Sequence, residues 1–168
     1  LGAGGASAVR GSLQSVLDYA VDEVLEEKGY QVSDKVILFD GVCNLCNSAV
    51  NFVLDHDVKD TFRFAALQSE TGHALLRKAR RDPHDLSTMV LVENGVVYDQ
   101  SDAVLRIGQQ LQLPGNAQAA ALVAQVIVPK PLRDWFCTDV VSKNRVKWFG
   151  LSGQCRLMDD ELESKFMN

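Results

Sequence analysis

The 168-residue sequence lacks several features that would assign it to a specialised class of protein. It has no apolar run near the ~20 residues that a membrane-spanning helix requires, so we expect a soluble chain that does not cross a membrane. Basic residues are not in excess, because 17 Lys and Arg stand against 22 Asp and Glu, which argues against nucleic acid as a partner. Four cysteines in a chain of this length do not resemble a small secreted disulfide scaffold. The hydrophobic share of 46% is enough for one sizeable core.

Two of the cysteines stand three positions apart, between a predicted strand and a predicted helix. The strand is expected because Val36 to Phe39 are four consecutive apolar residues, typical of a strand buried on both faces. Asp40 and Gly41 follow, and apolar residues then recur at three- and four-residue spacing. This pattern predicts Cys43 at the N-terminal edge of a helix and Cys46 one turn further in.

A cysteine at the edge of a helix is suited to thiol-disulfide exchange. Unpaired backbone N–H groups and the helix dipole stabilise a thiolate there. We therefore expect Cys43 to attack a substrate disulfide and Cys46, more shielded, to resolve the mixed disulfide. Asn44 and Leu45 between them supply no cation, so the helix end and backbone donors must stabilise the thiolate. Asp40 is a candidate proton acceptor for Cys46, or alternatively a cap of the loop or helix start.

Two other interpretations of Cys43 and Cys46 are open, half of a zinc site and a merely structural thiol pair. A four-cysteine zinc site would need Cys137 and Cys155 as its other half, but these are too far apart to form a second knuckle. No histidine stands near either of them. A Cys-x-x-Cys pair beside a βαβ pattern favours redox chemistry, and we expect no metal and no cofactor.

The order of the predicted elements is typical of an α/β fold. We expect the following elements: strand 36–40, helix 44–56, strand 62–66, helix 69–81, strands 89–93 and 96–98, and a helix capped by Ser101. Asn94-Gly95 is the strongest short signal for a two-residue hairpin between the last two strands. The resulting order β-α-β-α-β-β-α is that of a thioredoxin-like or glutaredoxin-like core. The cysteine pair follows the carboxyl end of the first strand, where sites in open α/β sheets are expected.

Three further segments surround this core, which we place at residues 34–113. Residues 1–12 are expected to be a flexible N-terminal segment and residues 13–29 an amphipathic helix. Residues 114–168 form a predicted C-terminal helical extension. Within it, the Ala-rich and uncharged stretch 117–128 predicts a buried or interface helix, and Pro131 marks the start of another.

Asp40, Cys43 and Cys46, together with later stretches, resemble the DCC family of thiol-disulfide oxidoreductases, which is named for its Asp-x-x-Cys-x-x-Cys signature. The resemblance extends from Val36 to about Phe166. The later stretches are Leu67-Gln68-Ser69, Ser101-Asp102-Ala103-Val104, Pro131-Leu132-Arg133-Asp134, Asn144-Arg145 with Trp148-Phe149-Gly150, and Cys155. The resemblance implies a thioredoxin-like fold and exchange with a protein disulfide or a low-molecular-weight thiol. Thioredoxins place a cis-proline before the third strand, whereas this chain has Ser87-Thr88-Met89, so we expect substrate docking to differ.

Other candidate residues lie in the C-terminal extension. Cys155 is a candidate third redox thiol, with a buried structural cysteine as the alternative. Asn144, Arg145 and Trp148 are candidates for binding an anion or a partner, and Arg145 alternatively forms a salt bridge to the core. A non-catalytic subunit of a larger complex, retaining the same fold, is the alternative to an exchange enzyme.

The first twelve residues are small, with one Arg and no acidic residue. This composition is typical of the tail of a transit peptide, so we expect an organelle, chloroplast or mitochondrion, with the cytoplasm as the alternative. A linker would have a similar composition.

Overall fold

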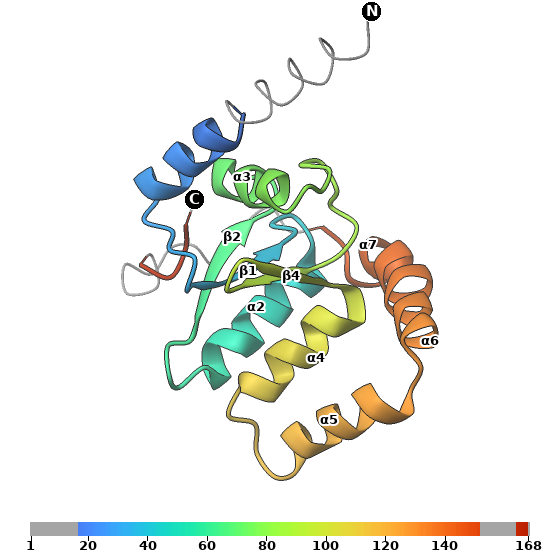
Figure 1. The fold of residues 1–168 in the computed structure, drawn as a ribbon. Coiled ribbons are helices and arrows are strands. Elements are labelled where there is room, and N and C mark those ends of the chain that lie inside the picture. Colours follow the sequence, from blue (N-terminus) through green and yellow to red (C-terminus); the bar gives the residue numbers. More distant parts are fainter. Residues whose placement is uncertain (1–16, 152–163, 168) are drawn as a thin grey trace, which may run out of the picture.

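A computed structural model of the chain describes residues 17–151 and 164–167. Its centre is a four-stranded sheet in the order β2-β1-β3-β4 (Figure 1). The strands are β1 (Lys35–Phe39), β2 (Phe62–Ala66), β3 (Val90–Glu93) and β4 (Val96–Asp99). β1 runs parallel to β2 and antiparallel to β3, and β3 pairs antiparallel with β4.

Helices connect these strands in the predicted order. They are α2 (Asn44–His56) after β1, α3 (Glu70–Lys78) after β2 and α4 (Gln100–Gln110) after β4. The hairpin between β3 and β4 turns at Asn94 and Gly95, whose φ angles of 51° and 74° confirm the predicted left-handed pair. The predicted thioredoxin-like α/β fold is therefore confirmed.

Both faces of the sheet are buried, which explains the continuous apolar sequence of β1. Ile37 and Phe39 point to the face that α2 and α4 cover, where they join Phe64 and Leu91. The other face is covered by α3 and by a helix of residues 17–27. Its side chains come from the alternate strand positions and from both helices: Val36, Leu38, Ala65, Val90, Val92, Leu75, Leu76, Val21 and Leu25.

Residues at the end of the described chain return to the sheet beside β2. The N–H of Phe64 donates to the carbonyl of Lys165 and the N–H of Met167 donates to that of Phe64, both at 2.8 Å. The ring of Phe166 packs on Phe64, with centroids 5.4 Å apart. This segment protects the outer edge of β2 from pairing with another chain.

Between residues 117 and 149, the C-terminal extension forms short helices that lie along one side of the core (Figure 1). They are α5 (Ala117–Ile127), α6 (Lys130–Trp135), the π-helix η1 (Phe136–Ser142) and α7 (Lys143–Phe149). α5 packs along α4, and α7 lies against α2. Within the residues that the structure describes, no helix is long and apolar enough to span a membrane.

An ion-pair cluster holds α6 to the start of α4. Arg133 lies 3.0 Å from Asp102, and Lys130 lies 2.8 Å from Asp102 and 2.7 Å from Asp134. The hydroxyl of Ser101 donates to Asp134 at 2.5 Å. The prediction that Ser101 caps α4 is wrong, because the helix begins at Gln100 and the Ser101 hydroxyl is engaged by α6.

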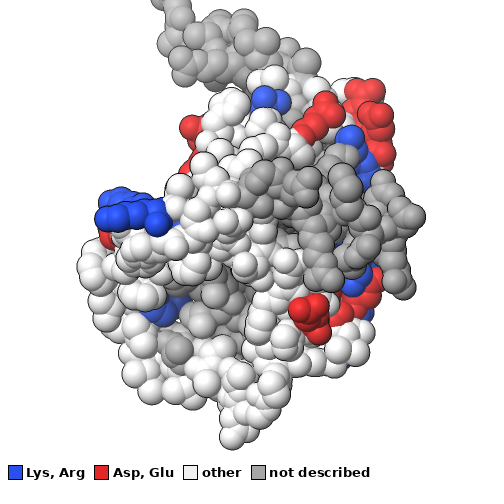
Figure 2. Space-filling view, turned by 180° about the vertical axis from the view of Figure 1, so that it is seen from behind, with Lys and Arg blue, Asp and Glu red and all other residues white. Residues whose placement is uncertain are grey.

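The composition of residues 117–128 predicted a buried or an interface helix, and in the structure α5 is not buried. Its large apolar side chains are exposed, and Val126 is 85% exposed. The sheet face that could have buried it is already covered by α2 and α4. Figure 2 shows few charged side chains over the lower part of the molecule, where α5 lies. The interface alternative for this helix stays a prediction.

Candidate active site

Cys43 occupies the N-cap position of α2, as predicted. Its backbone is extended, with φ −95° and ψ 120°, and its carbonyl accepts the first helical hydrogen bond from Asn47 at 2.9 Å. Its own N–H donates to the carbonyl of Asp40 at 3.2 Å. The sulfur is therefore attached to the residue from which the helix starts, where the helix dipole favours negative charge.

The residues that follow α7 pair with the start of α2 at Cys43. Leu151 forms an isolated antiparallel bridge with Cys43, and the N–H of Asn44 donates to the carbonyl of Gly150 at 3.4 Å. The side-chain amide of Asn44 also donates to the carbonyl of Phe149 at 2.8 Å. Cys43 is 0% exposed and Cys46 is 7% exposed, so the expectation that Cys46 is the more shielded thiol is wrong. Gly150 and Leu151 are more than a hundred residues away in sequence, so local spacing does not reveal their pairing with the start of α2.

Cys46 lies one turn into α2 as a free thiol, within hydrogen-bonding reach of the Cys43 side chain. Burial is the largest cause that raises the pKa of Cys46 to about 12, followed by its hydrogen bond and charge interaction with Cys43. The guanidinium of Arg145 opposes this rise, and Asp40 adds to it. Cys46 is therefore protonated at neutral pH in the reduced protein.

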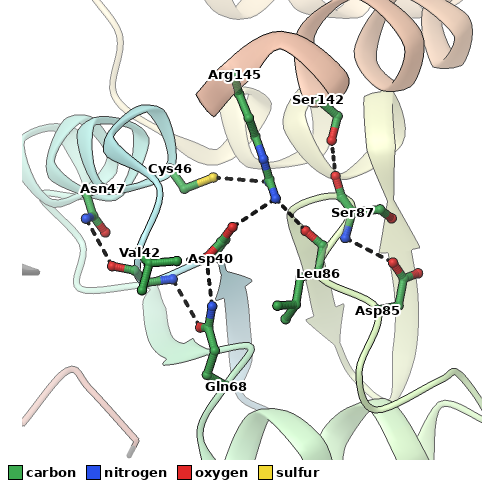
Figure 3. A network of polar contacts seen from close by, with 11 residues as sticks. Asp40, Val42, Cys46, Asn47, Gln68, Asp85, Leu86, Ser87, Ser142 and Arg145 are labelled. Atoms are coloured by element: carbon green, nitrogen blue, oxygen red, sulfur yellow. Dashed lines mark hydrogen bonds and ion pairs between the residues drawn. The ribbon is translucent and has the colours of Figure 1, made fainter. Parts of the chain in front are cut away.

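Arg145 joins Asp40 and Cys46 (Figure 3). Its Nη2 lies 2.8 Å from Oδ2 of Asp40, and its Nη1 lies 3.6 Å from Sγ of Cys46. The side chains of Arg145 and Asp40 are only 13% and 6% exposed, so this is a largely buried ion pair. Two roles for Arg145 were predicted, binding of an anion or a partner and a salt bridge to the core, and the structure contains the salt bridge. The structure also places a cation, the guanidinium of Arg145, beside the thiol pair. Asn44 and Leu45, the residues between the cysteines, could not supply one.

A polar loop fixes Asp40 at the end of β1. Its Oδ1 accepts from the N–H of Val42 at 3.2 Å and from Nε2 of Gln68 at 2.7 Å. The Oε1 of Gln68 in turn accepts from the N–H of Gly41 at 3.2 Å. Sequence analysis assigned no role to Gln68, although it stands in one of the stretches that carry the family resemblance. The contact with Val42 matches the loop-capping alternative for Asp40, and the proton-acceptor role stays a prediction.

The segment before β3 is held by the C-terminal extension. Nη2 of Arg145 donates to the carbonyl of Leu86 at 2.7 Å, and the hydroxyl of Ser142 donates to the carbonyl of Ser87 (Figure 3). This is the segment where thioredoxins have their cis-proline. Its carbonyls are thus already engaged within the chain, which supports the expectation that substrates dock differently.

The remaining candidates do not join this site as described. The side-chain amide of Asn144 donates to the carbonyl of Val140 within its own helical segment at 2.8 Å, and Trp148 is 55% exposed. Cys155 lies outside the described residues. Cys137 is a free, partly buried thiol, and burial is the main cause that raises its pKa. Among the described residues, no three His, Cys, Asp or Glu side chains are grouped to hold a metal ion.

Comparisons with known proteins agree with the site. A family model described as DCC1-like thiol-disulfide oxidoreductase matches residues 37–151. The chain is 38% identical over 137 residues to the uncharacterized protein YuxK of Bacillus subtilis (strain 168), covering 82% of this chain and 96% of that protein. It is 45% identical over 140 residues to the DCC family protein At1g52590, chloroplastic, of Arabidopsis thaliana, covering 82% and 79%. No solved structure matches.

Proposed function

The chain belongs to the DCC1-like thiol-disulfide oxidoreductase family, and we propose that Cys43 and Cys46 exchange a dithiol and a disulfide with a protein or low-molecular-weight thiol partner. The observation that carries this proposal is the placement of Arg145. Its guanidinium lies 3.6 Å from the Cys46 sulfur, where it stabilises negative charge that develops during exchange.

The reaction proceeds in two displacements. The Cys43 thiolate attacks a substrate disulfide, so that a bond from Cys43 to one substrate sulfur forms and the second substrate sulfur leaves and takes a proton. Cys46 then loses its proton and attacks the Cys43 sulfur, which forms the Cys43–Cys46 bond and releases the first substrate sulfur as a thiol. The substrate gains two electrons and the protein loses them. Arg145 stabilises the Cys46 thiolate, and Asp40 is a positioning residue that holds Arg145.

Protein disulfides require movement of the cover over Cys43. We infer that the contacts of Cys43 and Asn44 with Gly150 and Leu151 form this cover. They consist of few hydrogen bonds and an exposed leucine, since Leu151 is 62% exposed. Such a segment opens at a lower free energy than the core.

Insulin reduction in dithiothreitol tests the proposed function. Wild type is expected to accelerate precipitation of the insulin B chain, and Cys43→Ser to abolish the acceleration. Once reduced and freed of dithiothreitol, Cys46→Ser should accumulate a covalent adduct with insulin, because no second thiol is then present to resolve the mixed disulfide. Cys137→Ser is the matched control and should retain full activity. Equal activity of wild type and Cys43→Ser would contradict the proposal.

A partner-binding role is the second candidate, and the exposed C-terminal helices favour it. At least half of each of these apolar side chains is exposed: Leu122, Val123, Val126, Ile127, Leu132, Trp135, Phe136, Trp148 and Phe149. Apolar surface of this extent is typical of protein interfaces. Its test is whether Cys43→Ser, in the cell, still forms the complexes that wild type forms. Persistence of every complex together with loss of exchange would separate the two roles.

For the compartment, we propose an organelle, chloroplast or mitochondrion, with the cytoplasm as the alternative. The support is the Arabidopsis relative, whose name describes it as chloroplastic. Fractionation of the source cells, with detection by antibody, tests this location.

A further inference from the structure

A cavity of about 460 Å³ opens beside Cys46, between α2, α4 and η1. This volume lies within the range of sites that hold small molecules. Its lining is mainly apolar: Leu45, Ala49, Phe52, Val53, Met89, Val104, Ile107, Leu111 and Val141. Among the described residues that line it, Arg145 is the one with a formal charge, and Cys46 lies next to that cation.

The cavity reaches the thiol pair from the Cys46 side alone. Cys46 belongs to the lining, whereas Cys43 does not and is 0% exposed beneath its cover. A molecule in the cavity therefore meets the Cys46 sulfur first. The two sulfurs of one disulfide would face different partners, a small molecule at Cys46 and, once the cover opens, a protein at Cys43.

The lining selects against charged thiols such as glutathione. Each glutathione carries two carboxylates and an ammonium group, and burying them without partners costs several kcal/mol. The guanidinium of Arg145 cannot fully compensate, because its Nη2 is bound to Asp40 and to the carbonyl of Leu86. An uncharged apolar thiol loses little hydration free energy when it enters the cavity. Burial of its surface against the apolar walls stabilises the complex.

We propose that this cavity binds an uncharged, apolar low-molecular-weight thiol, which reduces the Cys43–Cys46 disulfide by attacking the sulfur of Cys46. The proposal rests on the proposed function, since it names one substrate class of the same thiol pair. It adds a second entrance to the pair, with its own chemical selectivity.

Electrons and protons balance over two steps. The thiolate of the first thiol attacks Cys46, so that its bond to Cys46 forms and the bond between the two cysteines breaks. Cys43 leaves as a thiolate at the start of α2, where the helix dipole favours it. A second thiol, as its thiolate, attacks the substrate sulfur of the mixed disulfide and releases Cys46. Two thiols become one disulfide, the protein gains two electrons, and the two protons end on Cys43 and Cys46.

Gly108 allows the cavity to be filled without disturbing its walls. It lies on α4 in the lining, and a Cβ added there meets nothing within 4 Å. Gly108→Leu therefore projects a side chain into open space, and Gly108→Ala is the matched control with little added volume. The readout is the reduction of the oxidised protein by benzyl mercaptan, 2-mercaptoethanol or glutathione, with each rate divided by the thiolate concentration.

We expect wild type and Gly108→Ala to react at least about tenfold faster with benzyl mercaptan than with either polar thiol. Gly108→Leu should remove this preference while leaving the glutathione rate unchanged. In single-cysteine variants treated with dibenzyl disulfide, a benzylthio adduct should form on Cys46 in Cys43→Ser, and Gly108→Leu should slow it. Equal rates with all three thiols, or no effect of Gly108→Leu on either reaction, would overturn the proposal.

A binding measurement separates failure of this proposal from failure of the proposed function. Benzyl methyl sulfide has the same apolar group but no thiol, so its binding requires no exchange. It should raise the melting temperature of the Cys43→Ser, Cys46→Ser double variant and have no effect once Gly108→Leu is added. Binding without any exchange by wild type would refute the exchange chemistry and with it the reductive step. Exchange without binding would refute the cavity alone.

Discussion

Asp40 at the end of β1 and Arg145 in α7 form a largely buried ion pair, with Nη2 of Arg145 2.8 Å from Oδ2 of Asp40. The two residues are 105 positions apart in the sequence. The pair attaches the C-terminal extension to the loop that carries the cysteines. It also fixes the second terminal nitrogen of Arg145 at 3.6 Å from Cys46. The guanidinium of Arg145 therefore contributes both to the stability of the fold and to the electrostatic environment of the thiol pair.

Arg145→Met is expected to lower the free energy of unfolding by about 3–5 kcal/mol, because it leaves the Asp40 carboxylate buried without its counter-ion. Adding Asp40→Asn should recover part of this loss, with a coupling energy of about 0.5–3 kcal/mol. Arg63→Met is the control, since its ion pair with Asp60 is far more exposed and should be worth about 1 kcal/mol or less. Urea denaturation measures Arg145→Met, Asp40→Asn, their double variant and Arg63→Met, and strictly additive losses at Asp40 and Arg145 would contradict the account.

Alkylation of Cys46 should have an unusual pH profile. Because burial raises its pKa to about 12, reaction with iodoacetamide should stay slow between pH 7 and 9 and increase well above pH 9. The folded pKa lies above the ordinary value of 9.0, so the protonated thiol stabilises the fold at lower pH and this contribution is lost as pH rises toward 12. Mass spectrometry of the Cys46 peptide gives the profile.

Two substitutions should move that profile in opposite directions. Arg145 lowers the pKa of Cys46 and Asp40 raises it, so Arg145→Met should slow alkylation at pH 10 and Asp40→Asn should accelerate it. A wild-type midpoint near 9, or shifts of the same sign in both variants, would be inconsistent with the arrangement described.

Asn44→Ala should expose Cys43. The substitution removes the hydrogen bond from the Asn44 amide to the carbonyl of Phe149, which helps hold the cover in place. If the closed position of the cover loses about 1 kcal/mol of stability, the alkylation rate of Cys43 rises roughly fivefold. Ser48→Ala, which removes a hydrogen bond to the Asn44 carbonyl on the exposed side of α2, is the control and should leave that rate unchanged. Equal rates in wild type and Asn44→Ala would show that the cover does not limit access.

Two glycines in helices should respond oppositely to alanine. A Cβ at Gly72 in α3 would lie 2.2 Å from the carbonyl oxygen of Ala66, so Gly72→Ala must displace the backbone of β2 or α3 and should cost at least about 1–3 kcal/mol. At Gly108 in α4 a Cβ meets nothing within 4 Å, so Gly108→Ala should stabilise by about 0.4–1 kcal/mol through helix propensity and chain entropy. Thermal unfolding of both variants measures the difference, and destabilisation of similar size by both would refute the packing described.

The elements of the core could be predicted because their signals are local. α2 and β2 have the predicted bounds, and the hairpin turns at Asn94-Gly95. Apolar periodicity, glycine and proline act within a few residues, so one sequence is enough to reveal them. The same locality places Cys43 at the start of α2.

The features that sequence analysis missed are long-range. The cover over Cys43 and the cation beside Cys46 both come from α7 and the residues directly after it, and no spacing rule connects that segment to the cysteines. Ser101 illustrates the same limit, because its hydroxyl is bound by α6 instead of capping α4. In each case, a tertiary partner overrides a local preference.

A redox titration of the purified protein tests the central claim most directly. The protein is equilibrated in dithiothreitol buffers of defined potential, alkylated, and analysed by mass spectrometry to locate every disulfide. We predict one disulfide, between Cys43 and Cys46, with a midpoint potential between about −300 and −120 mV. If these two sulfurs never pair, or pair only at potentials outside this range, the exchange function is contradicted and partner binding becomes the better explanation.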